Sequence, residues 1–249
     1  MEYLEDSMRA SLPNLKPYSG GNQMLNFAKR MLSRAGTRLS ERTVYNLNAA
    51  VSYLETGRWL RAHGFQPSAR VAGTRQLIDR IVDDVRDKKV LYLEFGVYRG
   101  ESMRYWSSQL RNPEANLHGF DSFEGLPENW NIDSPRGRFT TNGTIPHIED
   151  SRVKFFKGWF DDTLPLYQMP SHDRLVLYMD ADLYSSTIYV LNTLRTSIVP
   201  GTYIYFDEFA DRANELRAFA EFLNGSKSRF EFVAATPDNA KVVFQCVSD

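Results

Sequence analysis

Short apolar runs alternate with amphipathic stretches of helical length through most of the chain. The runs span five or six residues and are rich in β-branched and aromatic side chains, as expected of strands buried on both faces. They predict strands at residues 90–95, 117–121, 152–157, 174–179 and 202–206. Strands that alternate with helices in this way indicate an α/β fold with a parallel sheet.

Two further apolar runs, at residues 229–234 and 241–246, follow the alternating pattern. A turn containing Pro237 and Asn239 separates them, and together they predict a C-terminal antiparallel hairpin. The complete prediction is a Rossmann-like, seven-stranded, mostly parallel sheet. We assign this α/β domain to residues 71–249.

Residues 1–70 are predicted to form an N-terminal helical extension. Apolar residues recur at helical spacing up to Gly36 and again after Ser40, which is a candidate N-cap with Thr43 as the alternative. Amphipathic helices need a surface on which to bury their apolar faces. These helices either pack on the domain or form a lid or oligomerisation surface on its substrate side.

The connection at residues 126–150 is rich in Pro, Gly, Asn and Thr. A segment of this length without a predicted element is either functional or disordered. Because it leaves the end of the sheet where open α/β folds bind ligands, we interpret it as a substrate-covering loop. Trp130 and His147 are candidate substrate contacts, and an ordinary surface position is the alternative for each.

The turn after the first predicted strand has the sequence features of a ligand-binding loop. Gly96 and Gly100 let the backbone turn sharply and let a ligand approach it closely. Their spacing matches neither the dinucleotide fingerprint nor a phosphate-binding P-loop. Glu94 and Glu101 would repel a pyrophosphate but would accept hydrogen bonds from an ammonium group or a ribose hydroxyl. The turn therefore predicts a cationic nucleoside such as S-adenosylmethionine, with an ordinary strand–helix turn as the alternative.

Two later strand ends complete the predicted nucleoside site. Asp121 ends the second strand, where a ribose-binding carboxylate would lie. Gly158 and Trp159 follow the third strand and offer close backbone approach and a flat apolar surface to an adenine ring. In the alternative, this turn is simply the start of a helix near Asp162.

Acidic residues end the next two predicted strands. Asp180 follows the fourth, and Asp207 and Glu208 follow the fifth. Neighbouring parallel strands would bring these carboxylates to one edge of the sheet. Converging carboxylates raise one another's pKa values or bind a hard cation, and their oxygens suit Mg²⁺. Such a metal could hold a substrate hydroxyl and lower its pKa. In the alternative, Asp182 or Glu208 caps a helix or faces solvent.

Composition narrows the choice of partners. The formal net charge is −1 with the signs interspersed, so we do not expect nucleic-acid binding. The first residues are acidic and no apolar run has membrane-spanning length, so we expect neither a secretory signal nor a membrane anchor. The one cysteine, Cys246, can form no internal disulfide, and we expect a reducing, cytoplasmic location.

Four ordered motifs resemble the macrocin O-methyltransferase family. They are EFGVYRG from Glu94, DSFEGLP from Asp121, GWFDDTLP from Gly158 and DADLYSST from Asp180, and the resemblance covers roughly residues 85–222. It implies a class I S-adenosylmethionine-dependent methyltransferase that modifies a sugar hydroxyl or a related small molecule in natural-product pathways. Such enzymes are often Mg²⁺-dependent and commonly homo-oligomeric.

The resemblance also assigns roles by motif. Asp180 would be the general base and would share the metal with Asp207 and Glu208. The implied cofactor site comprises Glu94, Gly96 and Ser102 at the methionine end, Asp121 at the ribose, Gly158 and Trp159 at the adenine, and the motif residues Tyr98, Gly100, Ser122 and Phe123.

Two features depart from the family pattern. Metal-binding members commonly have Asp-Asp where this chain has Asp207 and Glu208, and the longer glutamate would shift, weaken or abolish metal binding. The N-terminal helices do not match the family's substrate-recognition region. The alternatives are a catechol-type phenol methyltransferase and a nicotinamide-dependent oxidoreductase, which would need the missing pyrophosphate loop. A non-catalytic binding protein would have no need of the acids.

Overall fold

The computed structural model describes residues 23–248 and separates the chain into two compact units, Met1–Asn46 and Leu47–Asp249. Helix α1 (Gln23–Gly36) lies in the first unit, and α2 (Glu41–Ala62) begins there and continues into the second. Ser40 is the N-cap of α2, as predicted, because its Oγ accepts a hydrogen bond from the backbone N–H of Thr43 at 3.1 Å.

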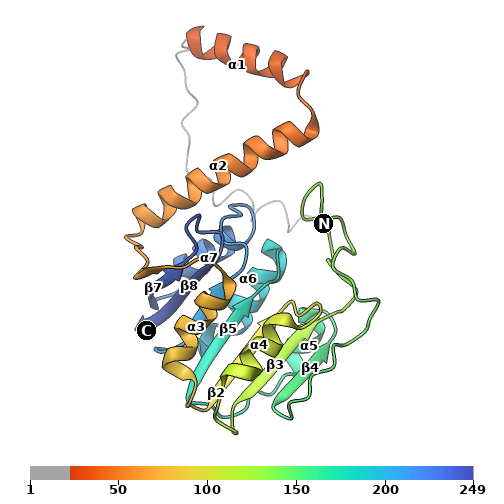
Figure 1. Ribbon diagram of the computed structural model, residues 1–249. Helices are drawn as coiled ribbons and strands as arrows, with labels where there is room; N and C mark the ends of the chain where they lie inside the picture. Colours follow the sequence, from red (N-terminus) through yellow and green to blue (C-terminus); the bar gives the residue numbers. More distant parts are fainter. Residues whose placement is uncertain (1–22, 249) are drawn as a thin grey trace, which may run out of the picture. The chain divides into compact units, whose positions relative to one another are not determined.

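The second unit contains one eight-stranded sheet with the strand order β1-β7-β8-β6-β5-β2-β3-β4 (Figure 1). Only β8 runs antiparallel to its neighbours, β6 and β7. The strands are β1 (Ala69–Arg70), β2 (Val90–Phe95), β3 (Asn116–Asp121), β4 (Val153–Lys157), β5 (Arg174–Met179), β6 (Tyr203–Phe206), β7 (Arg229–Ala235) and β8 (Val242–Ser248).

The seven predicted strands and the terminal hairpin are confirmed, but the predicted number of strands is wrong by one. The additional strand is β1, whose two residues pair in parallel with Ala234 and Ala235 at the edge of the sheet. Two residues are too few to carry an alternating pattern, so nothing in the local sequence identifies this strand.

Helices cover both faces of the sheet. One apolar cluster joins the sheet to α3 (Thr74–Val85) and α4 (Glu101–Gln109). The other joins it to α6 (Tyr184–Thr193) and α7 (Glu215–Asn224), with α5 (Phe160–Thr163) and the short 3₁₀ turns Leu164–Leu166 and Arg195–Ser197 on the same side. The carboxyl ends of the parallel strands therefore open at one edge between two helical layers, where α/β folds bind ligands.

The C-terminal half of α2 belongs to the second unit. Thr56 and Leu60 are buried, and the ring of Trp59 lies 5.9 Å from that of Phe209. This compact unit begins at Leu47, and a domain boundary after residue 70 stays a prediction. Helical periodicity alone does not say against which surface such a helix is buried.

Ser185 and Ser186 precede an apolar helical run, so local spacing predicts that one of them is the N-cap of α6, but the structure differs. The N-cap position is Leu183, and the backbone N–H of Tyr184 donates to Oδ1 of Asn214 at 2.9 Å. An acceptor from the segment before α7 thus replaces a local cap. Among residues 23–248, no helix is both long and apolar enough to cross a membrane.

Candidate active site

The turn between β2 and α4 lies directly against the end of β5. Gly96 has a φ of +92°, and a Cβ placed on it would lie 1.9 Å from the carbonyl oxygen of Asp180. Only glycine satisfies both constraints, since other residues rarely adopt this backbone conformation and have a side chain that would clash. The sequence therefore fixes a close approach of this turn to β5.

The carboxylate of Asp121 joins the ends of β2 and β3. Its Oδ2 accepts hydrogen bonds from the backbone N–H groups of Val97 and Tyr98, both at 2.8 Å, and its Oδ1 accepts one from Phe123 at 2.6 Å. A carboxylate offers about four acceptor positions, so one remains for a further donor. Asp121 consequently shapes the turn and still faces the cavity above it.

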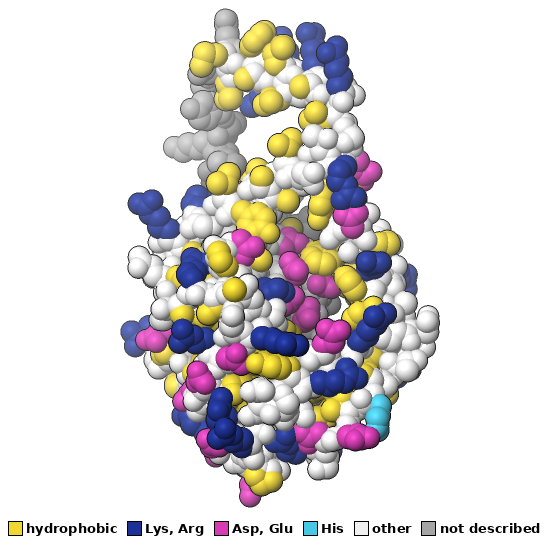
Figure 2. All heavy atoms as spheres, viewed as in Figure 1, with side chains coloured by type: hydrophobic (Ala, Val, Ile, Leu, Met, Phe, Trp, Pro, Cys, Tyr) yellow, Lys and Arg dark blue, Asp and Glu magenta, His cyan; other side chains and the backbone are white. Residues whose placement is uncertain are grey.

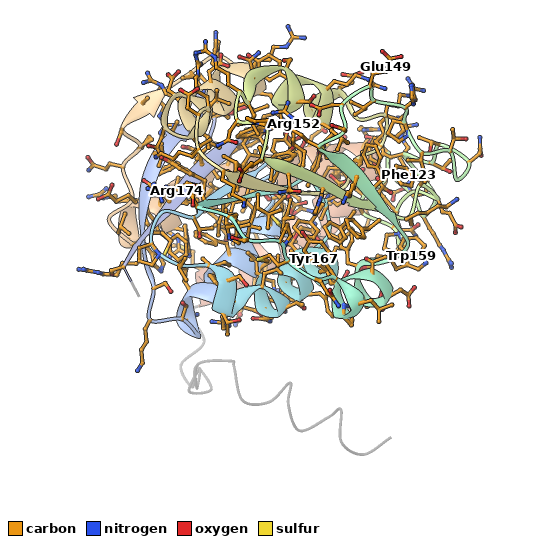
Figure 3. The ribbon with its side chains drawn as sticks, turned by 90° about the horizontal axis from the view of Figure 1, so that it is seen from below. Phe123, Glu149, Arg152, Trp159, Tyr167 and Arg174 are labelled. Atoms are coloured by element: carbon orange, nitrogen blue, oxygen red, sulfur yellow. The ribbon has the colours of Figure 1, made fainter. Side chains whose placement is uncertain are left out.

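A cavity of about 750 Å³ opens above these strand ends. Eight of the predicted site residues line it: Gly96, Tyr98, Asp121, Ser122, Trp159, Asp180, Asp207 and Glu208. Trp159 follows β4 and Phe123 follows β3, and both lie on the same side of the molecule in Figure 3. The parallel sheet thus brings residues from four separate motifs to one site.

Five other predicted cofactor residues do not line this cavity: Glu94, Gly100, Ser102, Phe123 and Gly158. Glu94 is fully buried, and its carboxylate accepts hydrogen bonds from Ser102 and, at 3.1 Å, from the hydroxyl of Tyr92. Burial raises the pKa of Glu94 to about 8. Gly100 is the N-cap of α4 with a φ of +74°. For all five residues, contact with a cofactor stays a prediction.

Acidic side chains gather in a hollow of the surface (Figure 2). Asp180, Asp182, Asp207 and Glu208 line the cavity at the ends of β5 and β6. Burial, with the neighbouring Asp207 carboxylate, raises the pKa of Asp180 well above its usual value. Burial and nearby carboxylates also raise the pKa values of Asp182 and Glu208 to about 7. Each pKa is raised because the carboxylates are partly desolvated beside like charges.

Each carboxylate oxygen of Asp207 accepts a hydrogen bond. Its Oδ1 accepts a hydrogen bond from the Tyr205 hydroxyl at 2.6 Å, and its Oδ2 accepts one from Nζ of Lys241 at 2.5 Å. Within residues 23–248, no three Asp, Glu, His or Cys side chains come together as a metal site would require. The predicted Mg²⁺ ligands share the cavity wall, but their donor oxygens do not fit the ion in this arrangement.

The Macrocin-O-methyltransferase (TylF) family model matches residues 56–231, more than half of the chain. The chain belongs to this family.

Two relatives of this Macrocin-O-methyltransferase family member have named substrates. The 8-demethyl-8-(2,3-dimethoxy-alpha-L-rhamnosyl)-tetracenomycin-C 4'-O-methyltransferase of Streptomyces olivaceus is 30% identical over 138 residues, which cover 47% of this chain and 52% of the relative. The demethyldecarbamoylnovobiocin O-methyltransferase of Streptomyces niveus is 27% identical over 183 residues, 63% of this chain and 68% of the relative. The chain thus spans about half the length of the first relative.

A solved structure shows the same fold. CalS11, a calicheamicin methyltransferase, superposes with a TM-score of 0.52 at 22% identity, over 68% of this chain and 76% of that chain. The mostly parallel sheet with its antiparallel C-terminal hairpin is therefore an architecture shared with known methyltransferases.

The long connection forms part of the cavity wall in this family member. Trp130, Arg136 and Phe139 line the cavity, and Nε1 of Trp130 donates to Oδ2 of Asp211 at 2.8 Å. His147, the other candidate contact, does not line the cavity, and its side chain is 86% exposed. Trp130 can be recognised in the sequence as an isolated aromatic residue in a polar loop, whereas nothing in the sequence sets Arg136 apart from other surface arginines.

Sequence reasoning also missed two charged groups beside the acids. Lys241 reaches Asp207 from 34 positions further along the chain. Glu215 is fully buried, and its Oε2 accepts a hydrogen bond from the backbone N–H of Glu208 at 2.9 Å. The Lys241 contact joins segments that are distant in the sequence, so no local spacing could have predicted it. Glu215 follows Glu208 by seven positions, and the irregular segment between β6 and α7 brings the two together.

Proposed function

We propose that this chain is an S-adenosylmethionine-dependent O-methyltransferase that acts on a hydroxyl group of a small molecule. Its membership of a methyltransferase family supports this reaction class. The observation that carries the proposal is the turn at residues 96–98. Asp121 accepts hydrogen bonds from this turn and lines the same cavity as Asp180. The free acceptor position of Asp121 suits a ribose hydroxyl, and the ring of Trp159 suits an adenine.

When bound, S-adenosylmethionine would supply a methyl group that its sulfonium has already activated. The chain then has to align the acceptor and remove a proton. Positioning is worth several kcal/mol in such reactions. Transfer of the methyl group from sulfur to the acceptor oxygen would require the acceptor hydroxyl to give up its proton. We assign that proton to the carboxylate of Asp180, which lines the cavity at the end of β5.

For the acceptor, we propose a sugar or a glycosylated natural product. The named relatives methylate molecules of this kind, and a cavity of about 750 Å³ has room for a cofactor and part of a glycoside. A phenolic acceptor is the second candidate, because the lining includes several aromatic rings: Tyr98, Trp130, Phe139, Trp159, Phe160 and Tyr189. The nicotinamide-dependent alternative is not retained, because the family is a methyltransferase family.

Mg²⁺ is not part of this proposal. The three predicted ligands line one cavity, but among residues 23–248 no three carboxylate, imidazole or thiol side chains converge as a metal site needs. We therefore derive no step through a metal. Three expectations stay predictions. They are a lid or homo-oligomer surface in the extension at residues 1–70, a domain boundary after residue 70, and a cytoplasmic location.

Cofactor binding can be tested without knowing the acceptor. We expect isothermal titration calorimetry to show one S-adenosylmethionine per chain. Asp121→Asn should weaken binding about tenfold or more, because the new amide N–H₂ would oppose the backbone donors of the turn. Asp161→Asn is the matched control, since Asp161 lines the same cavity but is exposed. Equal affinities in the two variants would remove Asp121 from the cofactor site.

Methyl transfer requires a second experiment. Purified enzyme with radiolabelled S-adenosylmethionine should label a member of a panel of glycosylated natural products, and catechols should serve as the phenolic comparison. Labelling of catechols alone would favour the second candidate function.

A further inference from the structure

Lys241 is held in place beside the acidic wall of the cavity. It precedes β8, and its backbone N–H donates to Oγ1 of Thr236 at 3.1 Å, while its carbonyl oxygen accepts from the Thr236 N–H at 2.9 Å. Thr236 is itself buried, and its hydroxyl donates to Asp238 at 2.6 Å. This closed turn fixes the start of the lysine side chain, so its position is part of the fold.

The ammonium group of Lys241 lies beside one carboxylate oxygen of Asp207. Nζ is 2.5 Å from Oδ2 of Asp207 and 3.4 Å from the carbonyl oxygen of the same residue. Both side chains of this ion pair are largely shielded from solvent, with 26% of Lys241 and 16% of Asp207 exposed. A partly buried ion pair with two contacts to one residue is not an incidental surface contact.

The surrounding charges explain why a cation is needed there. Asp180, Asp182 and Glu208 line the same wall, and Glu215 is buried behind Glu208 with its Oε1 lacking a hydrogen-bond partner. Carboxylates in this number repel one another unless they take up protons or a cation offsets their charge. A lysine ammonium is a compact positive charge that can offset these carboxylates. Unlike a metal ion, it does not need a fixed set of oxygen ligands around it.

A divalent ion would compete directly with this lysine. Mg²⁺ needs oxygens in near-octahedral positions at short distance, and one oxygen of Asp207 faces Lys241 while the other faces Tyr205. Binding the ion would require the ammonium to leave, because two cations cannot share one carboxylate oxygen without strong repulsion.

We propose that Lys241 is a positioning residue that takes the place of a divalent metal at this site, holding Asp207 against the cavity wall and offsetting the charge around Asp180. The inference rests on the proposed function for its role in methyl transfer. It implies that the wild-type chain binds S-adenosylmethionine and transfers methyl groups without a metal. It also implies that removing the ammonium group creates a metal site from the carboxylates left behind.

Metal binding tests this directly, with Mn²⁺ as a paramagnetic probe for an Mg²⁺ site. Electron paramagnetic resonance titrations of the full chain should show no specific Mn²⁺ binding up to about 1 mM. Lys241→Met, which removes the charge but keeps the apolar stem, should bind one Mn²⁺ per chain about tenfold or more tightly than wild type. Lys241→Arg should behave as wild type because it restores a cation, and Lys227→Met, at an exposed position, should be unchanged.

Two results would overturn the proposal. One is tight binding of Mn²⁺ by the wild-type chain that Asp207→Asn abolishes, a measurement that does not depend on whether Lys241→Met folds. The other is a folded Lys241→Met variant, checked by circular dichroism, that binds no more Mn²⁺ than wild type. S-adenosylmethionine affinity measured in the same samples separates the two proposals, because its absence would reject the proposed function and leave the metal result intact.

Discussion

Nε1 of Trp130 donates a hydrogen bond to Oδ2 of Asp211 at 2.8 Å and so ties the long connection to the segment between β6 and α7. Asp211 is fixed in turn, because the same oxygen accepts from Nδ2 of Asn214 at 2.7 Å. The side chain of Trp130 therefore lies over the cavity in a defined position. This contact explains how a loop without helix or strand can form a wall of the site.

Replacing Trp130 by Phe should loosen this wall. The variant keeps an aromatic ring and loses one neutral hydrogen bond, worth about 1 kcal/mol. We expect faster hydrogen–deuterium exchange at residues 126–138 with little change in the β-sheet. Trp159→Phe is the control, since Trp159 lines the cavity from another segment. Unchanged exchange in the loop would show that the Asp211 contact does not hold it.

Adding a methyl group at Gly96 should disrupt the site. Gly96→Ala would press its Cβ against the Asp180 carbonyl and impose an unfavourable φ, so we expect a loss of at least about 2 kcal/mol in the free energy of unfolding and no S-adenosylmethionine binding. Gly137→Ala is the matched control, because Gly137 has a φ of +81° and nothing within 4 Å of the added atom. Chemical denaturation and calorimetry measure both effects, and equal losses in the two variants would refute the steric argument.

Asp180→Asn should separate binding from catalysis. The variant cannot accept the acceptor proton, so we expect kcat to fall by about 10²-fold or more while the S-adenosylmethionine Kd stays nearly unchanged. Asp162→Asn, another residue of the cavity lining, should retain activity. Near-normal turnover by Asp180→Asn would exclude this carboxylate as the base.

His118 should make the protein less stable in mild acid. Burial lowers its pKa to about 4 from an ordinary 6.5, and its Nδ1 lies 2.7 Å from the Tyr167 hydroxyl. Between pH 6.5 and 4 the unfolded chain binds a proton that the folded chain does not, so this residue's contribution to stability decreases as the pH falls through that window.

The His118→Gln variant isolates this effect from the titration of the acids. Between pH 7 and 5, wild type should lose about 1–2 kcal/mol more of its free energy of unfolding than the variant. Urea denaturation at each pH provides the measurement. Parallel pH profiles for the two proteins would contradict a buried neutral histidine.

The central strands β2, β5 and β6 could be predicted because they are buried on both faces and therefore read as continuous apolar runs. The convergence of Asp121, Asp180 and Asp207 followed from the rule that parallel strands end at one edge. The Asp121 contacts with the turn could not be predicted, since they depend on the left-handed conformation of Tyr98, whose φ is 51°.

Contacts between distant segments were beyond the reach of the sequence patterns. The cap that Asn214 provides for α6 and the ion pair between Lys241 and Asp207 each join residues 30 or more positions apart. Local spacing predicted a serine cap and an open metal site instead. In the first case Asn214 accepts the hydrogen bond of the Tyr184 N–H, and in the second Lys241 pairs with the carboxylate of Asp207. Both partners come from distant parts of the chain.

Calorimetric titration of the full chain with S-adenosylmethionine in the presence of a metal chelator tests the central claim most directly. The account predicts one bound S-adenosylmethionine per chain, with weaker binding in Asp121→Asn and unchanged binding in Asp161→Asn. A correctly folded wild-type chain that releases no binding heat and is not stabilised against thermal unfolding by the ligand would contradict it.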